Sequence, residues 1–395
     1  MTEQVIQAEA GELSGFYAQL QHVVPPVAES ASLPGVSYSS AAVLEREKQA
    51  IFRQSWICLG RADQWTESGQ YSSRQIVDIP VIICRDEKLQ LRVYVNSCRH
   101  RGARLLEDGQ GSCKTFRCPF HRWTYQLNGQ LLLAPKFPRQ GEAGALNKSD
   151  YGLLELPVAE RAGFAFVALS EDVPPLAEWL GDFPVLHAAW SFDRLQTYRR
   201  HEFVVNCNWK AFLDVFNEYY HLPYVHPNSL DDFYNAPEPA DEVKGQYATQ
   251  FGFTAGNPSL LEETQQHALP VMPGMPEREG RGTRYSWVFP NLTFAANRDA
   301  VWIYEALPLT THSSQVALTL CFAPESFATA DFEQRAEHYF ERLITAIEED
   351  IPALENQQAG LNAPVSNQGR YHALLEPNVA GFAFWYARMM AAATA

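Results

Sequence analysis

Four potential metal ligands stand close together in the sequence, as two short pairs. The first pair is Cys98 and His100, and the second, after seventeen intervening residues, is Cys118 and His121. Two thiolates and two neutral imidazoles are the ligands of a Rieske-type [2Fe-2S] centre, in which sulfur binds one iron and nitrogen the other. Such a centre has a potential of about −150 to +300 mV, against about −400 mV with four thiolates. The motif therefore predicts a centre that accepts electrons readily and passes them on.

Two cysteines and two histidines also form tetrahedral zinc sites, so a structural zinc ion is the alternative. The surrounding sequence favours the cluster. Each pair follows a strand-like run, over residues 91–95 and 114–117, and would present its ligands at the tip of a loop. Gly102 and Pro119 suit tight turns that bring backbone amides near the cluster sulfurs.

The composition excludes several classes of partner. The 395 residues are enough for two or three domains, and their formal net charge of −15 would repel nucleic acid. Residues 1–13 are polar and acidic, unlike a secretory signal, and no run approaches the ~18 to 20 apolar residues of a membrane span. Seven cysteines, an odd number, do not form a disulfide framework. We therefore expect reduced cysteines, a cytoplasmic location and no nucleic-acid or membrane partner.

The hydrophobic pattern divides the chain into three expected parts. Residues 1–44 form an N-terminal segment that packs on the C-terminal domain. Residues 45–160 open with helical spacing and continue as short alternating runs, which indicate an all-β module that holds the cluster. Residues 161–395 mix strand-like runs with helical segments near 210–220 and 331–351, which indicates an α+β domain.

A second metal motif lies in the C-terminal domain. Glu218 and His221 are three residues apart, which would place them on one face of a helix. Pro223 would end that helix and let His226 return beside His221. Non-haem Fe(II) is commonly bound by two histidines and one carboxylate on one face of the metal. His221 and His226 would supply the two histidines, so one carboxylate ligand must come from elsewhere in the chain. The acidic run 348–350 could supply the carboxylate, although such a run is more often a solvated helix face.

Together, the two motifs resemble the Rieske non-haem iron oxygenases of the ring-hydroxylating family, oxygenase (alpha) component. The resemblance covers about residues 51–390. The single-subunit layout, Glu at position 218 and the ending 376–389 are most similar to the choline, carnitine and glycine-betaine monooxygenase branch. The sequence departs from the family at Arg122, where Gly is commoner, and at residues 214–217, which weakens a role for Asp214 near the iron.

The resemblance assigns roles to particular residues. Asp350, preceded by Glu and followed by Glu355 and Gln358, matches the third ligand of the mononuclear iron, beside His221 and His226. Glu218 matches the acid that bridges a cluster histidine of one subunit to an iron histidine of its neighbour. This implies that Glu218 carries electrons from His121 of an adjacent chain.

The resemblance also implies the fold, cofactors and partners. The fold is α+β, with an all-β Rieske domain followed by a helix-grip domain, an antiparallel sheet plus helices, that binds mononuclear non-haem iron. The protein would be a homotrimer and a monooxygenase or dioxygenase that uses O2. A separate flavin and iron-sulfur reductase would supply electrons from NAD(P)H.

The branch implies hydroxylation of a quaternary ammonium or betaine compound, with N-demethylation or C–N cleavage. A quaternary cation requires aromatic ring faces. Each candidate ring could instead pack in the core. Two alternatives remain open, an aromatic (carboxylate) hydroxylase or O-demethylase, for which an arginine in the pocket is expected, and a Rieske electron-transfer protein without oxygenase activity. The candidate substrate-binding residues are Phe212, Phe216, Tyr285, Trp287, Trp302 and Tyr304.

Overall fold

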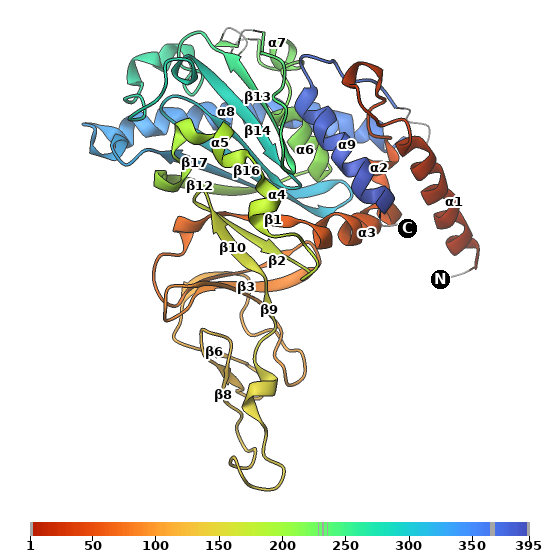
Figure 1. The fold of residues 1–395 in the computed structure, drawn as a ribbon, viewed down its shortest axis with the longest axis vertical. Helices are drawn as coiled ribbons and strands as arrows, with labels where there is room; N and C mark the ends of the chain where they lie inside the picture. The colour runs from red at the N-terminus through yellow and green to blue at the C-terminus, as the bar shows by residue number, and fades with distance from the viewer. Residues whose placement is uncertain (1–2, 228, 231–232, 235, 364–367, 393–395) are drawn as a thin grey trace. The chain divides into compact units, whose positions relative to one another are not determined.

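The computed structural model describes residues 3–227, 229–230, 233–234, 236–363 and 368–392, and these form two units (Figure 1). The larger unit combines residues 1–58 with residues 174–395, and the smaller unit is residues 59–173. The expected cluster domain, 45–160, has different limits from the smaller unit. Helix α3 (Ala41–Ala50) contacts α9 (Pro377–Ala392) in the larger unit, and β10 (Val158–Arg161) pairs with β11 (Phe164–Ala168) in the smaller one.

The smaller unit is built from short strands in three sheets. Their orders are β5-β2-β3-β4-β9, β6-β7-β8 and β1-β11-β10. An apolar core that includes Ile82, Tyr94, Phe116 and Tyr125 surrounds the two cluster cysteines. The strands are β1 (Trp56–Arg61), β2 (Gln70–Ile76), β3 (Ile79–Arg85), β4 (Leu91–Val95), β5 (Gly109–Ser112), β6 (Phe116–Arg117), β7 (Thr124–Tyr125), β8 (Leu131–Leu133), β9 (Glu155–Leu156), β10 and β11.

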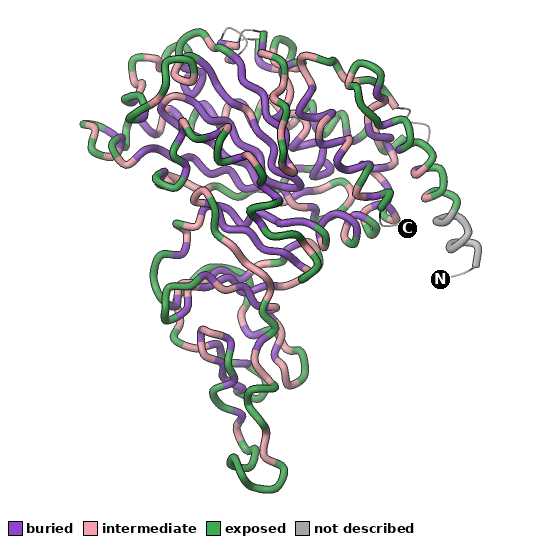
Figure 2. The backbone as a smooth tube through the Cα atoms, in the orientation of Figure 1, coloured by how far each residue is buried: buried purple, intermediate pink, exposed green. Residues whose placement is uncertain are grey.

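The larger unit contains a six-stranded antiparallel sheet in the order β12-β17-β16-β15-β14-β13. All of its strands except the edge strand β12 are largely buried, as the purple segments in Figure 2 show. The strands are β12 (Gln196–Val205), β13 (Tyr247–Phe253), β14 (Gly282–Val288), β15 (Leu292–Ala296), β16 (Val301–Thr310) and β17 (Ser313–Phe322). The helices are α1 (Glu3–Leu20), α2 (Val36–Ser39), α3, α4 (Leu176–Leu180), α5 (Phe183–Leu186), α6 (Trp209–Phe216), α7 (Leu222–Val225), α8 (Phe332–Leu361) and α9.

Aromatic packing shows which helices cover the sheet. Trp287 of β14 stacks on Phe382 of α9 with ring centroids 4.0 Å apart, and Phe382 also meets Trp209 of α6 at 5.7 Å. The guanidinium of Arg342 on α8 lies 5.1 Å from the ring centroid of Trp302 on β16. Helices α6, α8 and α9 thus pack on the sheet. The α+β fold class, strands for the cluster domain and an antiparallel sheet with helices for the second, is confirmed.

Helix α8 runs through a proline. The sequence predicts a helical segment near residues 331–351, and α8 continues past Pro352 to Leu361, although a proline inside a helix removes a backbone hydrogen bond. Tertiary contacts hold the added turns. Leu354 is buried, and the Gln358 side chain accepts from the backbone N–H of Asn208 at 2.7 Å and donates to the Tyr38 carbonyl at 3.1 Å.

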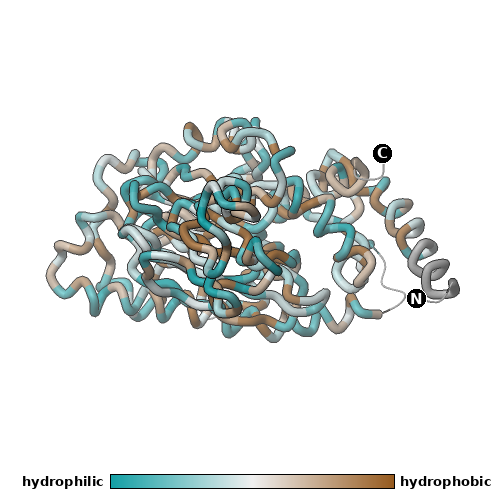
Figure 3. The backbone as a smooth tube through the Cα atoms, turned by 90° about the horizontal axis from the view of Figure 1, so that it is seen from below, coloured by the Kyte–Doolittle hydropathy of each residue, from teal (hydrophilic) through white to brown (hydrophobic). Residues whose placement is uncertain are grey.

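Hydrophobic and hydrophilic residues are mixed along the backbone (Figure 3). Within the described residues, no helix combines the length and apolar character needed to cross a membrane.

Candidate metal centres and the cavity beside them

The two cluster pairs lie on two loops with similar hydrogen bonding. In the first, the Cys98 N–H donates to the Ala103 carbonyl at 2.8 Å, and the Gly102 N–H donates to the Cys98 carbonyl at 2.8 Å. In the second, the Cys118 N–H donates to the Trp123 carbonyl at 2.8 Å, and the Arg122 N–H donates to the Cys118 carbonyl at 3.1 Å. Gly102 has φ +75° and Arg122 has φ +62°. The left-handed backbone at position 122 explains why glycine suits it.

The cluster ligands differ in exposure. Cys98 and Cys118 are buried, whereas His121 is exposed. The imidazole of His100 stacks on Trp123 with centroids 5.0 Å apart, and its buried Nδ1 has no hydrogen-bond partner in the structure. The His100 and His121 ring centroids are 4.6 Å apart. An unpartnered buried ring nitrogen beside two buried thiols fits a metal centre.

Tyr125, which the sequence did not single out, lies with its Oη 3.2 Å from the Cys98 Sγ and accepts from the Arg99 N–H at 3.0 Å. Its hydroxyl hydrogen is therefore free to reach the sulfur, and hydrogen bonds to cluster sulfurs tune the potential.

The second motif is not helical in the way the sequence indicates. Helix α6 ends at Phe216, because the Asn217 side chain donates to the Leu213 carbonyl at 2.7 Å and caps the last turn. Glu218 therefore follows the helix, and His221 is the N-cap of the short α7. Pro223 does not end a helix; it lies in the first turn of α7, where its missing N–H costs nothing.

His221, His226 and Asp350 converge from two distant parts of the chain. The Nε2 atoms of His221 and His226 lie 3.7 and 3.0 Å from Oδ1 of Asp350. The three ligand atoms all lie within 4.8 Å of one another. The Asp350 Oδ1 is buried and accepts no hydrogen bond in the structure. A carboxylate oxygen without a donor, facing two imidazole nitrogens, fits a divalent iron ion.

Two further carboxylates set the orientation of the imidazoles. Glu218 Oε1 lies 2.6 Å from Nδ1 of His221, and Glu349 Oε2 lies 2.6 Å from Nδ1 of His226. Each Nδ1 then carries the hydrogen, which leaves each Nε2 lone pair for a metal. Burial alone would lower the pKa of His221, but the hydrogen bond and charge of Glu218 and the charge of Asp350 raise it. This role of Glu349 was not predicted from the sequence. The position of Glu349 next to the expected iron ligand Asp350 is the feature that could have indicated the role.

The other two residues of the family pattern on α8 have different contacts. Glu355 accepts from the Asn206 side chain at 2.8 Å, and Gln358 bonds to Asn208 and Tyr38. Neither lines the cavity at the iron-ligand candidates. They attach α8 to its neighbours and so fix the position of Asp350.

A cavity adjoins the three iron-ligand candidates, with about 470 Å³ of empty space, including the part open to solvent. Of the six aromatic candidates, Phe212 instead packs against Tyr304 with centroids 5.5 Å apart, and Trp287 stacks on Phe382 in the core. The sequence missed Tyr219, Tyr234 and Arg342, which contribute to the wall. The four candidates that line the cavity are Phe216, Tyr285, Trp302 and Tyr304.

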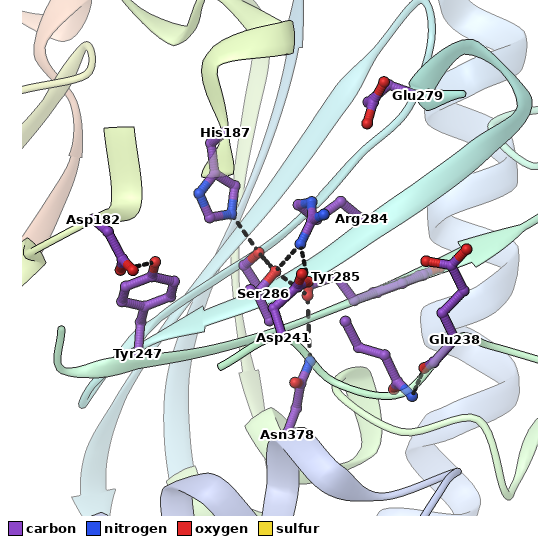
Figure 4. A network of polar contacts seen from close by, with 12 residues as sticks. Asp182, His187, Glu238, Asp241, Tyr247, Glu279, Arg284, Tyr285, Ser286 and Asn378 are labelled. Atoms are coloured by element: carbon purple, nitrogen blue, oxygen red, sulfur yellow. Dashed lines mark hydrogen bonds and ion pairs between the residues drawn. The ribbon is translucent and has the colours of Figure 1, made fainter. Parts of the chain in front are cut away.

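A buried polar network holds the strand that carries Tyr285 (Figure 4). On the adjacent residue, the Ser286 hydroxyl lies 2.7 Å from Nε2 of His187 and 2.7 Å from the Thr249 hydroxyl. The Asn378 side chain donates to the Tyr285 carbonyl at 3.3 Å. Burial lowers the pKa of His187 to about 3, so its imidazole is neutral. The network fixes β14 from behind while Tyr285 faces the cavity.

A second cavity, here the acidic cavity, shares Val215, Glu218 and His221 with the first. Its lining includes three carboxylates, of Asp214, Glu218 and Glu376, and one arginine, Arg370. Burial raises the pKa of Asp214 to about 7, although its hydrogen bond from the Tyr38 hydroxyl, at 2.8 Å, lowers it. Glu218 lines both cavities, so it connects the iron-ligand candidates to this second space.

Comparisons with known proteins agree with this geometry. Choline monooxygenase from Atriplex hortensis is 28% identical over 372 residues, which cover 91% of this chain and 78% of that protein. The oxygenase subunit of glycine betaine monooxygenase from Chromohalobacter salexigens is 25% identical, with 91% and 86% covered. A solved quaternary ammonium Rieske monooxygenase has the same fold, with a TM-score of 0.77, 24% identity and coverage of 94% and 98%.

Family models match both parts of the chain. The Rieske [2Fe-2S] domain matches residues 55–150, and the catalytic domain of the ring-hydroxylating alpha subunit matches residues 192–392, half of the sequence. The expected enzyme class and cofactors, a [2Fe-2S] cluster and mononuclear iron, are thereby confirmed. The chain belongs to the ring-hydroxylating family of Rieske non-haem iron oxygenases, as an alpha subunit with both its cluster domain and its catalytic domain.

Proposed function

We propose that this protein hydroxylates a small quaternary ammonium or betaine compound, with N-demethylation or C–N cleavage as the result. The observation that carries the proposal is the convergence of His221, His226 and Asp350 beside a cavity walled by aromatic rings. Aromatic faces attract quaternary nitrogen, and the wall offers four of the expected rings. The choline and glycine betaine monooxygenases among the relatives support the same substrate class.

Each metal group has a set of residues to hold it. Cys98, His100, Cys118 and His121 would bind the cluster, and His221, His226 and Asp350 the mononuclear iron. When bound, the cluster supplies electrons and the iron supplies open positions for O2. The protein's own contribution is to orient the imidazoles through Glu218 and Glu349.

We propose a homotrimer in which the cluster of one subunit serves the iron of the next. The exposed His121 is followed in the sequence by the exposed Arg122, and the charge of the exposed Arg101 also acts on its imidazole. The acidic cavity beside Glu218 has the complementary charge. Glu218 accepts from His221 through Oε1 and from two backbone N–H groups through Oε2, which leaves one acceptor position for a partner's histidine. Sedimentation analysis tests the trimer, and Arg122→Glu should weaken it.

A separate flavin and iron-sulfur reductase would supply the electrons from NAD(P)H, in a cytoplasmic setting. In support, the related glycine betaine monooxygenase protein is named as an oxygenase subunit, which implies a separate subunit that supplies its electrons. All seven cysteines lie outside disulfides in the structure.

The decisive experiment supplies the iron-loaded protein with O2, NADH and a surrogate reductase. Glycine betaine, γ-butyrobetaine, choline and benzoate are compared by substrate-dependent O2 uptake and by mass spectrometry of the products. We expect O2 uptake coupled to loss of a methyl group or to C–N cleavage. Oxygenation of benzoate alone would contradict the proposal.

A second candidate function is hydroxylation or O-demethylation of an aromatic carboxylate. One observation favours it, because the arginine expected for such a substrate is present in the cavity wall as Arg342. The electron-transfer alternative is disfavoured because the catalytic-domain family model covers residues 192–392.

A further inference from the structure

Arg342 is a buried charge with no ionic partner among the described residues. It is 3% exposed, its Nε is buried without a hydrogen-bond partner, and Nη2 donates to the Tyr234 hydroxyl at 3.2 Å. Its guanidinium lies 5.1 Å from the ring centroid of Trp302. Arg342, Tyr234 and Trp302 all line the cavity at the iron-ligand candidates.

Two other arginines of the larger unit with little-exposed side chains each have a carboxylate partner. Arg200, with a side chain 11% exposed, pairs with Glu305 at 2.8 Å, and Arg284, with a side chain 4% exposed, pairs with Asp241 at 2.5 Å. Buried charges are paired because an unpaired one loses its hydration without compensation. Among the described residues, Arg342 instead contacts the neutral hydroxyl of Tyr234 and the ring face of Trp302. We therefore expect an anionic ligand in the cavity to be its partner.

The position of Arg342 on α8 determines how far an anionic ligand bound to it would lie from the iron-ligand candidate Asp350. Arg342, Ala346 and Asp350 follow one another at intervals of four residues, and all three line the cavity. Eight residues of helix span about 12 Å. The small side chain of Ala346 leaves room between the guanidinium at one end and the iron-ligand carboxylate at the other.

We propose that Arg342 binds the carboxylate of the substrate and so restricts the enzyme to carboxylate-bearing substrates. The proposal rests on the proposed function only in taking this cavity as the substrate site. A guanidinium holds a carboxylate through two parallel hydrogen bonds, which a lysine cannot reproduce. The substrate would lie along α8 with its reacting carbon toward Asp350. Choline, which has no carboxylate, would leave Arg342 unpaired.

The test compares ligands that differ only in the carboxylate. Anaerobic calorimetric titration of the holoenzyme measures γ-butyrobetaine against its methyl ester, and benzoate against methyl benzoate. We expect the wild type to bind the acid of at least one pair about 10- to 100-fold more tightly than its ester. Arg342→Gln should abolish this preference and leave ester binding unchanged, whereas Arg342→Lys should keep a reduced preference.

Arg335→Gln is the matched control, because Arg335 lies on the same helix, donates to the Ala268 carbonyl at 2.9 Å and is absent from the cavity wall. It should keep the full acid preference. Measurements of iron content and melting temperature check that each variant is folded and loaded with metal. If Arg342→Gln fails to fold, the comparison of acid preference between the wild type and Arg342→Lys tests the proposal. A wild type without acid preference in either pair, or a preference that survives Arg342→Gln, would overturn the proposal.

The two ligand pairs separate this proposal from the proposed function. An Arg342-dependent preference for benzoate with no betaine binding supports the role of Arg342 and contradicts the betaine substrate. Equal binding of γ-butyrobetaine and its ester, together with no preference for benzoate over its ester, supports the betaine substrate and contradicts the role of Arg342.

Discussion

The two candidate metal centres are assembled in opposite ways. The cluster residues all lie between positions 98 and 121, on two loops with matching hydrogen bonds. The iron-ligand candidates join a turn at 221–226 to position 350 on α8, and their geometry depends on the packing of α8 against the rest of the larger unit. A local motif is visible in the sequence, whereas a site made by tertiary packing is visible only in part.

The surroundings of the two centres differ as much as their assembly. His121 is exposed and flanked by basic side chains, whereas His226 is buried and held by Glu349. The first arrangement suits exchange with a partner, and the second suits enclosure of a reacting group. Variants on each side should therefore have separable effects.

The largest effect is expected from Asp350→Ala. Loss of the only carboxylate among the three iron-ligand candidates should reduce the iron content from about three to about two per chain and lower turnover by at least about 10³-fold. The visible spectrum of the cluster should persist, because its ligands lie in the other unit. Metal analysis and visible spectroscopy measure both.

Cys118→Ser provides the reciprocal comparison. It should remove the cluster spectrum and leave the mononuclear iron in place. Loss of both metal groups in either variant would contradict the separation of the two centres.

A smaller effect is expected from Glu349→Gln. The amide cannot accept as strongly from Nδ1 of His226, so the iron affinity should fall about 10- to 100-fold. Competition with an iron chelator measures this. Glu348→Gln, an exposed neighbour on the same helix, should change nothing; equal losses in both variants would show that helix charge, not the hydrogen bond, is responsible.

Asp214→Asn should change the pH dependence of stability. Burial raises the pKa of Asp214 from 3.8 to about 7, so between these values the folded state holds a proton that the unfolded state has released. Stability is therefore lost as pH rises through this window, by about 2 to 4 kcal/mol. The Asp214→Asn variant has no carboxyl group to titrate, so it should not show this loss. The difference in melting temperature between the variant and the wild type should therefore increase from pH 5 to pH 8. The exposed Asp193→Asn should show no such trend.

The smallest effect is expected from Arg122→Gly. A left-handed φ of +62° costs a non-glycine residue roughly 1 kcal/mol, which glycine would avoid. Glycine also increases the conformational entropy of the unfolded chain, and this offsets part of the gain in stability. The temperature at which the cluster absorbance bleaches should rise slightly. Arg122→Ala removes the same charge and keeps the Cβ atom, so an equal rise in both variants would assign the effect to charge.

How far the sequence predicts the structure depends on the range of the contacts. The cluster pairs and His221 with His226 are local and were found directly, and the fold class followed from the hydrophobic pattern and from the resemblance to a family. The helical placement of Glu218 was wrong, because the Asn217 cap ends α6 before it. Arg342 and Tyr234 were missed because only packing brings them to one cavity.

By itself, the sequence determined the ligand types, their local spacing and the family, because these depend on neighbouring residues and on motif chemistry. The tertiary structure decided which aromatic rings face the cavity, that Glu349 orients His226, and that Arg342 lines the cavity with no ionic partner among the described residues. The physical reason is that burial and the absence of a counter-ion are properties of the packed chain. A buried charge becomes informative only when its neighbours in the folded chain are known.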